Sequence, residues 1–553
     1  MTTLARTDTA NSRLADLPQW LRVTIALCAG GLTPLALAPL GWWPLSILTP
    51  ACFALLLWQQ PIRQNFNISF AFGLGLFAVG ASWVYVSIHD YGHAPLWLAT
   101  LLTALFVSFL ALVFALPFAL TVWTPKVFQH PRFKPGTVNP RAFKKAAQAT
   151  TAKANDQSSA AHVSVSSAMP LGPHLLCFSL IWVLGEWSRS WFLTGFPWLF
   201  AGYSQWPTPL AGWAPVTGVY GVSLAVLLSS CGLMYLLVGQ KLTAKITTLA
   251  VLTGLWGGGQ ILRGIEWTTA SAPPKQVSLV QANIPQEKKW QPSFLQPTLE
   301  RYRELSKPAW QSDWVIWPEA AIPLLYHRAL PFLEEVNQQA VATHTALITG
   351  ILFDDQQRGD YYNSAAGLGL AAGIYHKTRL VPFGEYVPLE NVLRGLIQFF
   401  NLPTSIINRG PENQAGLQIA NLRLATAICY EIVYPDLVAR HSENRDVILT
   451  ISNDAWFGAS WGPPQHLEMA QMRALETGRP VIRATNNGIS AFITPKGQLT
   501  QTSEQFVQTV ITGEVTPMQG FTPFMRWGSL PLIGVCFLLL MGVRGLVARR
   551  ALP

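Results

Sequence analysis

The chain has 553 residues, of which half are hydrophobic and only 12% are charged, and it contains 22 tryptophans. This composition is too apolar for an ordinary water-soluble protein. The formal net charge is +10, but the cations cluster in short segments rather than on one continuous face, which argues against nucleic-acid binding.

Long stretches without a charged residue occupy the first half of the chain. No Asp, Glu, Lys or Arg occurs between Arg22 and Arg63, between Arg63 and Asp90, or between Arg189 and Lys241. A hydrocarbon core of roughly 30 Å needs about 20 apolar residues per helix. We therefore predict seven membrane spans before residue 265 and an eighth near the end of the chain. The expected spans are 21–39, 43–59, 66–88, 96–122, 172–191, 210–238, 246–264 and 528–546.

The orientation of these spans is predicted from the loop at 123–171, which carries seven Lys and Arg residues against the single acid Asp156. Because Lys and Arg accumulate in cytoplasmic loops, this loop and both chain termini are expected inside the cell. The predicted organisation is a cytoplasmic tail (1–20), a seven-helix region (21–265), an exterior domain (271–523), a last helix (528–546) and a cytoplasmic tail (547–553).

The predicted exterior domain alternates short β-rich runs with helical patterns, which favours an α/β layered domain with buried sheets. Its length of about 250 residues is enough for one core. The expected strands include 277–280, 314–317, 346–349, 425–428 and 447–451, and the expected helices 298–305, 329–343 and 465–477.

Polar residues follow several of these strands, and strand ends are where α/β enzymes usually place their chemistry. Glu319 follows one run, Cys429 follows another, and Lys377 lies just before Leu380. Cys429 is the only cysteine in the predicted exterior domain, so it has no disulfide partner there. A thiol nucleophile needs a base and donors for the oxyanion it creates, and Glu319 and Lys377 are candidates for these roles.

Each of the three residues also has a structural interpretation. Cys429 fits a buried apolar position, Glu319 fits the first turn of a helix, and Lys377 fits a surface cation. The residues alone leave these alternatives open.

The local sequences resemble a known family. The motifs around Trp317-Pro318-Glu319, His376 to Glu385 and Ile428-Cys429-Tyr430-Glu431 resemble the Glu-Lys-Cys motifs of the nitrilase (carbon-nitrogen hydrolase) superfamily. That resemblance implies an αββα sandwich. An eight-span frame that carries such a domain before its last helix is similar to the apolipoprotein N-acyltransferase family, as are the runs 195–198, 452–458 and 483–488.

The resemblance implies a multi-pass enzyme of the bacterial inner membrane with a periplasmic catalytic domain. Its expected reaction transfers an acyl group from a phospholipid, with phosphatidylethanolamine as the expected donor, to the α-amine of the diacylglyceryl-cysteine of an apolipoprotein. Cys429 would carry the acyl group as a thioester, Glu319 would act as base, and Lys377 with a backbone N–H near Tyr430 would stabilise the oxyanion. The implied enzyme is a monomer without a cofactor, and the histidines show no metal-ligand spacing.

Four further residues match family positions. Glu385 would orient Lys377 or form a structural ion pair with it, and Glu431 would support the loop that carries Cys429. Trp290 would contact acyl chains or serve as an interfacial aromatic. Asn363 matches a position near the site, with no independent reason in the sequence to prefer it.

Two alternatives remain open. In a membrane-tethered amidase of the same superfamily, water would resolve the thioester. In a transporter with an inert nitrilase-like domain, charged residues within a span would act on the cargo, and Glu186 and Arg189 are the candidates.

Overall fold

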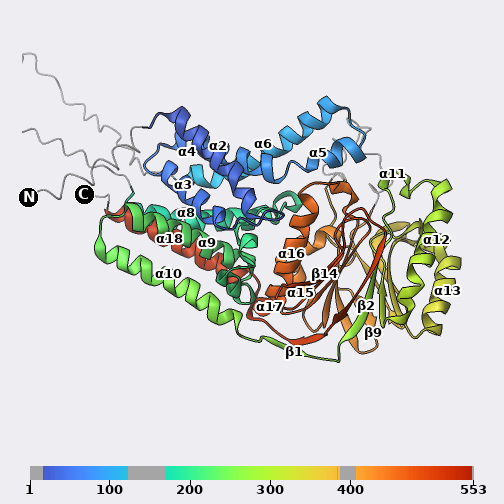
Figure 1. Ribbon diagram of the computed structural model, residues 1–553. Helices are drawn as coiled ribbons and strands as arrows, with labels where there is room; N and C mark the ends of the chain where they lie inside the picture. The colour runs from blue at the N-terminus through green and yellow to red at the C-terminus, as the bar shows by residue number, and fades with distance from the viewer. Residues whose placement is uncertain (1–16, 122–168, 383, 387–406, 551–553) are drawn as a thin grey trace, which may run out of the picture.

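The computed structural model describes residues 17–121, 169–382, 384–386 and 407–550. A region of apolar helices lies beside a domain of packed sheets and helices (Figure 1). Residues 123–168 of the predicted cytoplasmic loop lie outside the described residues. The same holds for residues 1–16 of the predicted N-terminal tail and for residues 551–553.

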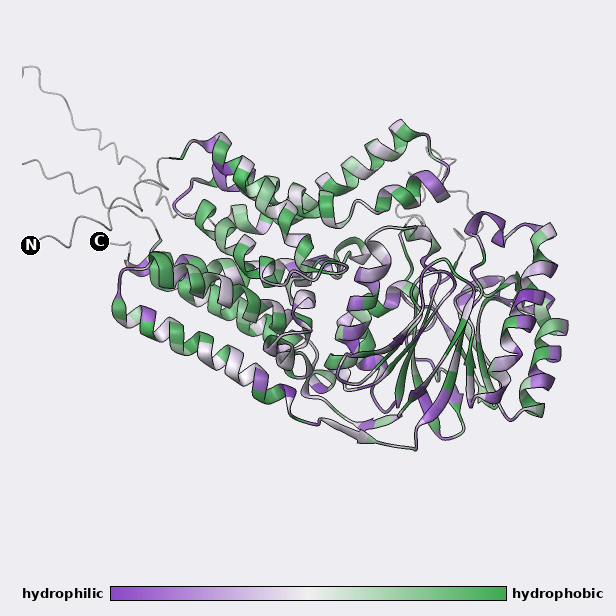
Figure 2. Ribbon diagram, in the orientation of Figure 1, coloured by the Kyte–Doolittle hydropathy of each residue, from purple (hydrophilic) through white to green (hydrophobic). Residues whose placement is uncertain are grey.

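Together with short 3-10 turns, the described helical region contains nine α-helices and a π-helical turn. They are α2 (Gln19–Leu32), α3 (Leu45–Leu57), α4 (Ile62–Gly80), α5 (Val84–Val86), the π-helix η2 (Ser87–Tyr91), α6 (Leu96–Thr121), α8 (Leu171–Arg189), α9 (Ala214–Val238), α10 (Leu242–Arg263) and α18 (Leu530–Arg550). Their apolar character contrasts with the polar outer helices of the neighbouring domain (Figure 2).

The prediction of eight spans is not confirmed. Within the described residues, three helices are long and apolar enough to cross a membrane: Leu96–Ala119, Pro209–Val238 and Leu530–Arg549. The pair α4 and α5–η2 forms a fourth candidate, which is bent by 60°. The span expected at 21–39 differs most, because α2 ends at Leu32 and a 3-10 turn, Thr33–Ala36, follows. Absence of charge in the sequence does not reveal such breaks.

Two seven-stranded sheets form the other domain, and both mix parallel and antiparallel pairs. One has the order β14-β13-β12-β11-β10-β9-β7, and the other has the order β15-β2-β3-β5-β6-β8 with β4 paired to β5. The strands of the first are β7 (Ala371–Ala372), β9 (Gln418–Ile419), β10 (Leu422–Ile428), β11 (Val447–Ser452), β12 (Val481–Thr485), β13 (Ala491–Ile493) and β14 (Leu499–Thr502). Those of the second are β2 (Lys275–Gln281), β3 (Trp314–Ile316), β4 (Ile322–Leu325), β5 (Ala346–Asp355), β6 (Asp360–Gly369), β8 (Ile374–His376) and β15 (Thr509–Val515). A small ribbon of β1 (Thr268–Ala270) and β16 (Met518–Gly520) lies beside them.

The two sheets pack face to face, and helices cover both outer faces. Apolar residues of β2, β3, β5, β10, β11 and β12 share one buried cluster between the sheets. Helices α12 (Leu295–Ser306) and α13 (Tyr326–Ala342) pack on the outer face of one sheet, whereas α15 (Pro435–His441) and α16 (Gly462–Thr477) cover the other. This is the layered α/β arrangement that the alternating pattern predicted.

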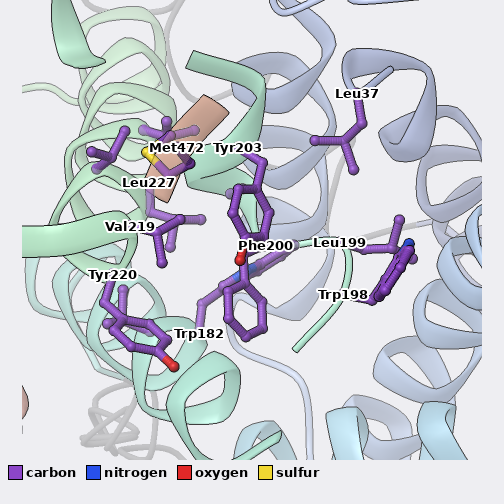
Figure 3. Packing of buried hydrophobic residues seen from close by; sticks show 14 of the residues in the cluster. Leu37, Trp182, Trp198, Leu199, Phe200, Tyr203, Val219, Tyr220, Leu227 and Met472 are labelled. Atoms are coloured by element: carbon purple, nitrogen blue, oxygen red, sulfur yellow. The ribbon is translucent and has the colours of Figure 1, made fainter. Parts of the chain in front are cut away.

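Helix α16 joins the two parts of the molecule. All but one of its residues are buried, because one side meets the sheet and the other meets α9. Met472 of α16 lies near Leu227 and Val219 of α9, with Tyr203 close by (Figure 3). The sheet domain is therefore packed directly against the helical region rather than tethered to it by a linker.

Candidate active site

Glu319 lies in the segment that follows β3, and its carboxylate is buried between the two sheets' strand ends. Its Oε1 accepts a hydrogen bond from Asn363 Nδ2 at 2.7 Å, and its Oε2 accepts from the Asn453 N–H at 2.8 Å. The segment passes so close to β5 that a Cβ at Gly350 would come within 2.6 Å of the Glu319 Cα. Only glycine leaves room for this approach.

Lys377 directly follows β8 and is buried beside two carboxylates. Its Nζ donates to Glu385 Oε1 at 2.9 Å and lies 3.6 Å from Glu319 Oε1. Burial lowers the pKa of Lys377, but Glu385, Glu319 and Cys429 outweigh it and raise the pKa above its ordinary value. Lys377 is thus held as an ammonium ion.

Asn363 of β6 links the two carboxylates. The same Nδ2 that donates to Glu319 also donates to Glu385 Oε1 at 2.9 Å. The structure thus brings Glu319, Lys377, Glu385 and Asn363 into one contact group, including the residue that the sequence gave least reason to choose. An amide donor between two acids fixes both carboxylates without adding charge.

Cys429 follows β10 and begins the 3-10 turn Cys429–Val433 with a φ of +53°. A left-handed backbone is uncommon for a residue with a side chain and costs on the order of 1 kcal/mol or more. Part of the side chain remains accessible. Burial of the thiol and the nearby Glu319 raise its pKa, whereas Lys377 lowers it.

A second buried network supports the Cys429 backbone, and its residues were not assigned roles from the sequence. His466 of α16 lies with Nε2 3.2 Å from the Cys429 carbonyl oxygen. Because a carbonyl only accepts, Nε2 must carry the hydrogen. Nδ1 is then free to accept from Arg483 Nη2 at 3.1 Å, and the same guanidinium pairs with Asp454 at 2.6 Å. Burial and Arg483 lower the pKa of His466 and outweigh the Asp454 carboxylate, which lies 3.3 Å from Nδ1 and raises it.

Glu431 connects the Cys429 turn to the Lys377 segment. Its two carboxylate oxygens accept from the N–H groups of Ile428, Thr378 and Arg379, all between 2.7 and 3.0 Å. Glu431 therefore fixes the two segments relative to each other rather than facing the thiol.

Tyr430, beside the thiol, points toward the helical region. Its hydroxyl donates to the Gly195 carbonyl at 3.1 Å, and its ring stacks on Trp198. The loop that receives this hydrogen bond contains three successive positive φ angles, at Leu193, Thr194 and Gly195. A segment of the helical region therefore reaches the immediate neighbourhood of the candidate nucleophile.

The structure adds two residues that sequence reasoning missed, Asn453 and Lys289. Asn453 follows β11 just as Cys429 follows the neighbouring parallel strand, so the strand-end criterion would have found it. Lys289 is buried with its Nζ 3.2 Å from the Glu319 carbonyl oxygen. Trp290 follows it and is 36% exposed. No group of three or more His, Cys, Asp or Glu side chains that could hold a metal occurs among the described residues.

Comparison with known proteins covers both parts of the chain. The model of the carbon-nitrogen hydrolase family matches residues 276–519, and that of the apolipoprotein N-acyltransferase N-terminal domain matches 29–137 and 158–232. The apolipoprotein N-acyltransferase of Azotobacter vinelandii is 44% identical, covering 95% of each chain. This chain belongs to the apolipoprotein N-acyltransferase family.

A second relative, the apolipoprotein N-acyltransferase of Pseudomonas syringae pv. tomato, is 43% identical over 96% of this chain and 98% of its own. Among solved structures, a carbon-nitrogen hydrolase from Helicobacter pylori is 15% identical, with a TM-score of 0.33, over 44% of this chain and 89% of its own. Apolipoprotein N-acyltransferase family membership thus extends over nearly the whole chain, and the carbon-nitrogen hydrolase part of it corresponds to the two-sheet domain.

Proposed function

We propose that this chain transfers an acyl group from a phospholipid, through a thioester on Cys429, to the α-amine of the diacylglyceryl-cysteine of an apolipoprotein. The observation that carries the proposal is the partly buried Cys429, whose thiol is close enough to Glu319 and Lys377 for both to shift its pKa, beside apolar helices that pack against the neighbouring Tyr430. The family to which the chain belongs supports the nature of both substrates.

In the first half-reaction, Glu319 takes the proton of the Cys429 thiol, and the thiolate attacks the ester carbonyl of the phospholipid. The oxyanion of the tetrahedral intermediate is stabilised by the Lys377 ammonium and by a backbone N–H at Tyr430. The carbon-oxygen bond then breaks, the leaving alkoxide takes the proton from Glu319, and a lysophospholipid departs. Glu385 and Asn363 keep the ammonium and the base in place.

In the second half-reaction, the α-amine of the lipoprotein attacks the thioester carbonyl. Glu319, again a carboxylate, accepts a proton from the amine, and the Cys429 thiolate leaves. The products are an N-acylated lipoprotein and, once the proton returns from Glu319, the free thiol. No cofactor takes part, and the chain works as a monomer.

We further propose that the chain has eight membrane segments in the bacterial inner membrane, with the sheet domain in the periplasm and both termini in the cytoplasm. Lys241 and Lys245 begin α10 and Arg544 and Arg549 end α18, and both of these helix ends lie at the side of the helical region away from the sheets (Figure 1). Cations at that end fit the cytoplasmic side. Segments shorter than a full span, such as α2 and α3, would complete their crossing with the turns that flank them.

The two residues considered for transport, Glu186 and Arg189, are both buried in the helical region. Glu186 accepts hydrogen bonds from the Trp182 indole and the Ala201 N–H, and Arg189 packs over the rings of Phe77, Phe114 and Phe200. These are contacts of a packed interior.

The test separates transfer from hydrolysis. Full-length protein in phosphatidylethanolamine nanodiscs, with a radiolabelled acyl chain, is mixed with a diacylglyceryl lipopeptide that has a free α-amine. We expect label on the lipopeptide, and none when its amine is acetylated. Release of free fatty acid with an unmodified lipopeptide would contradict the proposal and indicate a hydrolase.

A further inference from the structure

Two adjacent lysines, Lys288 and Lys289, have opposite environments. Both lie in the short helix α11 (Gln286–Lys289). Lys288 is exposed, with its Nζ 5.7 Å from the centre of the Phe294 ring. Lys289 is 2% exposed and extends inward. Lysine is almost never fully buried without a partner, so the position of Lys289 needs a physical reason.

The contacts of Lys289 lead to the candidate active site. Its Nζ donates to the main-chain carbonyl of Glu319 at 3.2 Å, and the charges of Glu319 and Cys429 both act on it. The same helix is anchored a second time, because Gln286 Oε1 accepts from Asn453 Nδ2 at 2.7 Å. Asn453 is the residue whose N–H binds the Glu319 carboxylate. Helix α11 is thus fixed to both sides of Glu319.

The charged side chains around the Cys429 thiol indicate a role for Lys289. Before the reaction, Glu319 and Glu385 are negative and Lys377 is positive. Two further acids lie near Cys429: Asp454 is paired with Arg483, and the Glu431 carboxylate accepts hydrogen bonds from backbone N–H groups. Transfer of the thiol proton to Glu319 leaves this sum unchanged, because the thiolate and Glu385 then face Lys377, so one negative charge is unbalanced both before and after the transfer. Unbalanced buried charge is costly.

We propose that Lys289 is a second active-site cation, which balances the excess negative charge of this cluster and thereby stabilises the thiolate that forms at Cys429. This inference rests on the proposed function, since it supports the same nucleophile. Lys289 acts on the reacting sulfur through space and through Glu319, so it is a positioning and charge-balancing residue. Burial lowers its pKa to about 8, partly opposed by Glu319 and Cys429, so it is still mostly an ammonium at pH 7.

The experiment measures the reactivity of Cys429 against pH. Full-length wild type, Lys289→Gln, Lys289→Arg and the neighbouring control Lys288→Gln are treated with iodoacetamide, and alkylation of the Cys429 peptide is followed by mass spectrometry. We expect the pH midpoint of Cys429 alkylation to rise in Lys289→Gln by on the order of one pH unit. This corresponds to about tenfold less thiolate at pH 7. Lys289→Arg should keep its midpoint at or below that of wild type, and Lys288→Gln should match wild type.

Two outcomes would overturn the inference. One is a lower alkylation rate in Lys289→Gln without a change in the pH midpoint, which would mean that Lys289 only anchors helix α11. The other, which also decides the matter if Lys289→Gln does not fold, is a midpoint for Lys289→Arg above that of wild type.

Failure of the proposed function is seen separately. If wild type and Lys288→Gln are alkylated normally but acquire no acyl group from phosphatidylethanolamine, the acyltransferase proposal fails whatever Lys289 does.

Discussion

Two of the places where the protein buries charged side chains have different surroundings. In the candidate active site, Glu319, Lys377 and Glu385 meet beside Cys429, which is only partly buried as a residue. On α16, Arg473 and Glu476 are fully buried against α9, with Arg473 Nε 2.7 Å from Glu476 Oε2. Glu476 Oε1 also accepts the Val219 N–H at 2.7 Å, just after the break that Gly218 makes in α9.

The difference teaches that burial of charge does not by itself mark a reactive site. The α16 pair satisfies a backbone N–H that the break in α9 leaves without a helical partner. The other cluster surrounds an atom that can react. Substitutions in the candidate active site should therefore change activity. Substitutions of the α16 pair should change stability.

The largest effect is expected for Lys377→Met. The change keeps the length of the side chain but removes the ammonium that donates to Glu385, and with it the support of the oxyanion. We expect acyl transfer to fall by about 10²–10³-fold. Turnover of labelled phospholipid measures this, with the exposed Lys307→Met as the control. Activity within a few fold of wild type would remove Lys377 from the mechanism.

A loss of stability is expected for Glu476→Ala. It leaves Arg473 buried without its carboxylate and the Val219 N–H without an acceptor, at a cost of about 3–5 kcal/mol. Thermal unfolding in detergent should show the loss, and the exposed Glu443→Ala should not. Alkylation of Cys429 in the protein that remains folded should keep its wild-type pH midpoint. A shifted pH midpoint of Cys429 alkylation with unchanged stability would contradict this prediction.

The smallest effect is expected for Glu468→Gln, also on α16. Burial raises the pKa of Glu468 to about 8, and its carboxylate accepts a hydrogen bond from the Ala38 N–H at 3.3 Å. A carboxyl whose pKa is raised on folding contributes stability that is lost as pH rises from its unfolded value toward about 8. Wild type should therefore lose stability over this range, while Glu468→Gln does not. The gain in melting temperature of the variant should be larger at pH 8 than at pH 5; an equal difference at both values would contradict this.

Strand ends and local motifs predicted much of the sheet domain. Strands at 277–280, 314–317, 346–349, 425–428 and 447–451 are confirmed, as are the helices around 298–305, 329–343 and 465–477. The polar residue after each of two buried strands led to Glu319 and Cys429, because alternating strands and helices bring strand ends together.

Other features depend on packing that the sequence pattern does not contain. Lys288-Lys289 looks like an exposed pair, and only the fold turns the second lysine inward. The charges of α16 predict a solvated face, yet Arg473 and Glu476 are buried because another layer of helices covers them. The end of α2 at Leu32 lies within an uninterrupted apolar run, so hydropathy gave no sign of it.

The central claim is that Cys429 carries the acyl group, and intact mass spectrometry of full-length protein incubated with phosphatidylethanolamine tests it most directly. We expect an added mass of one acyl chain in wild type, removed by hydroxylamine and absent in Cys429→Ala. In Cys429→Ser, any adduct should be an ester that resists mild hydroxylamine. A folded wild-type protein that acquires no adduct, or an adduct that persists in Cys429→Ala, would contradict the claim.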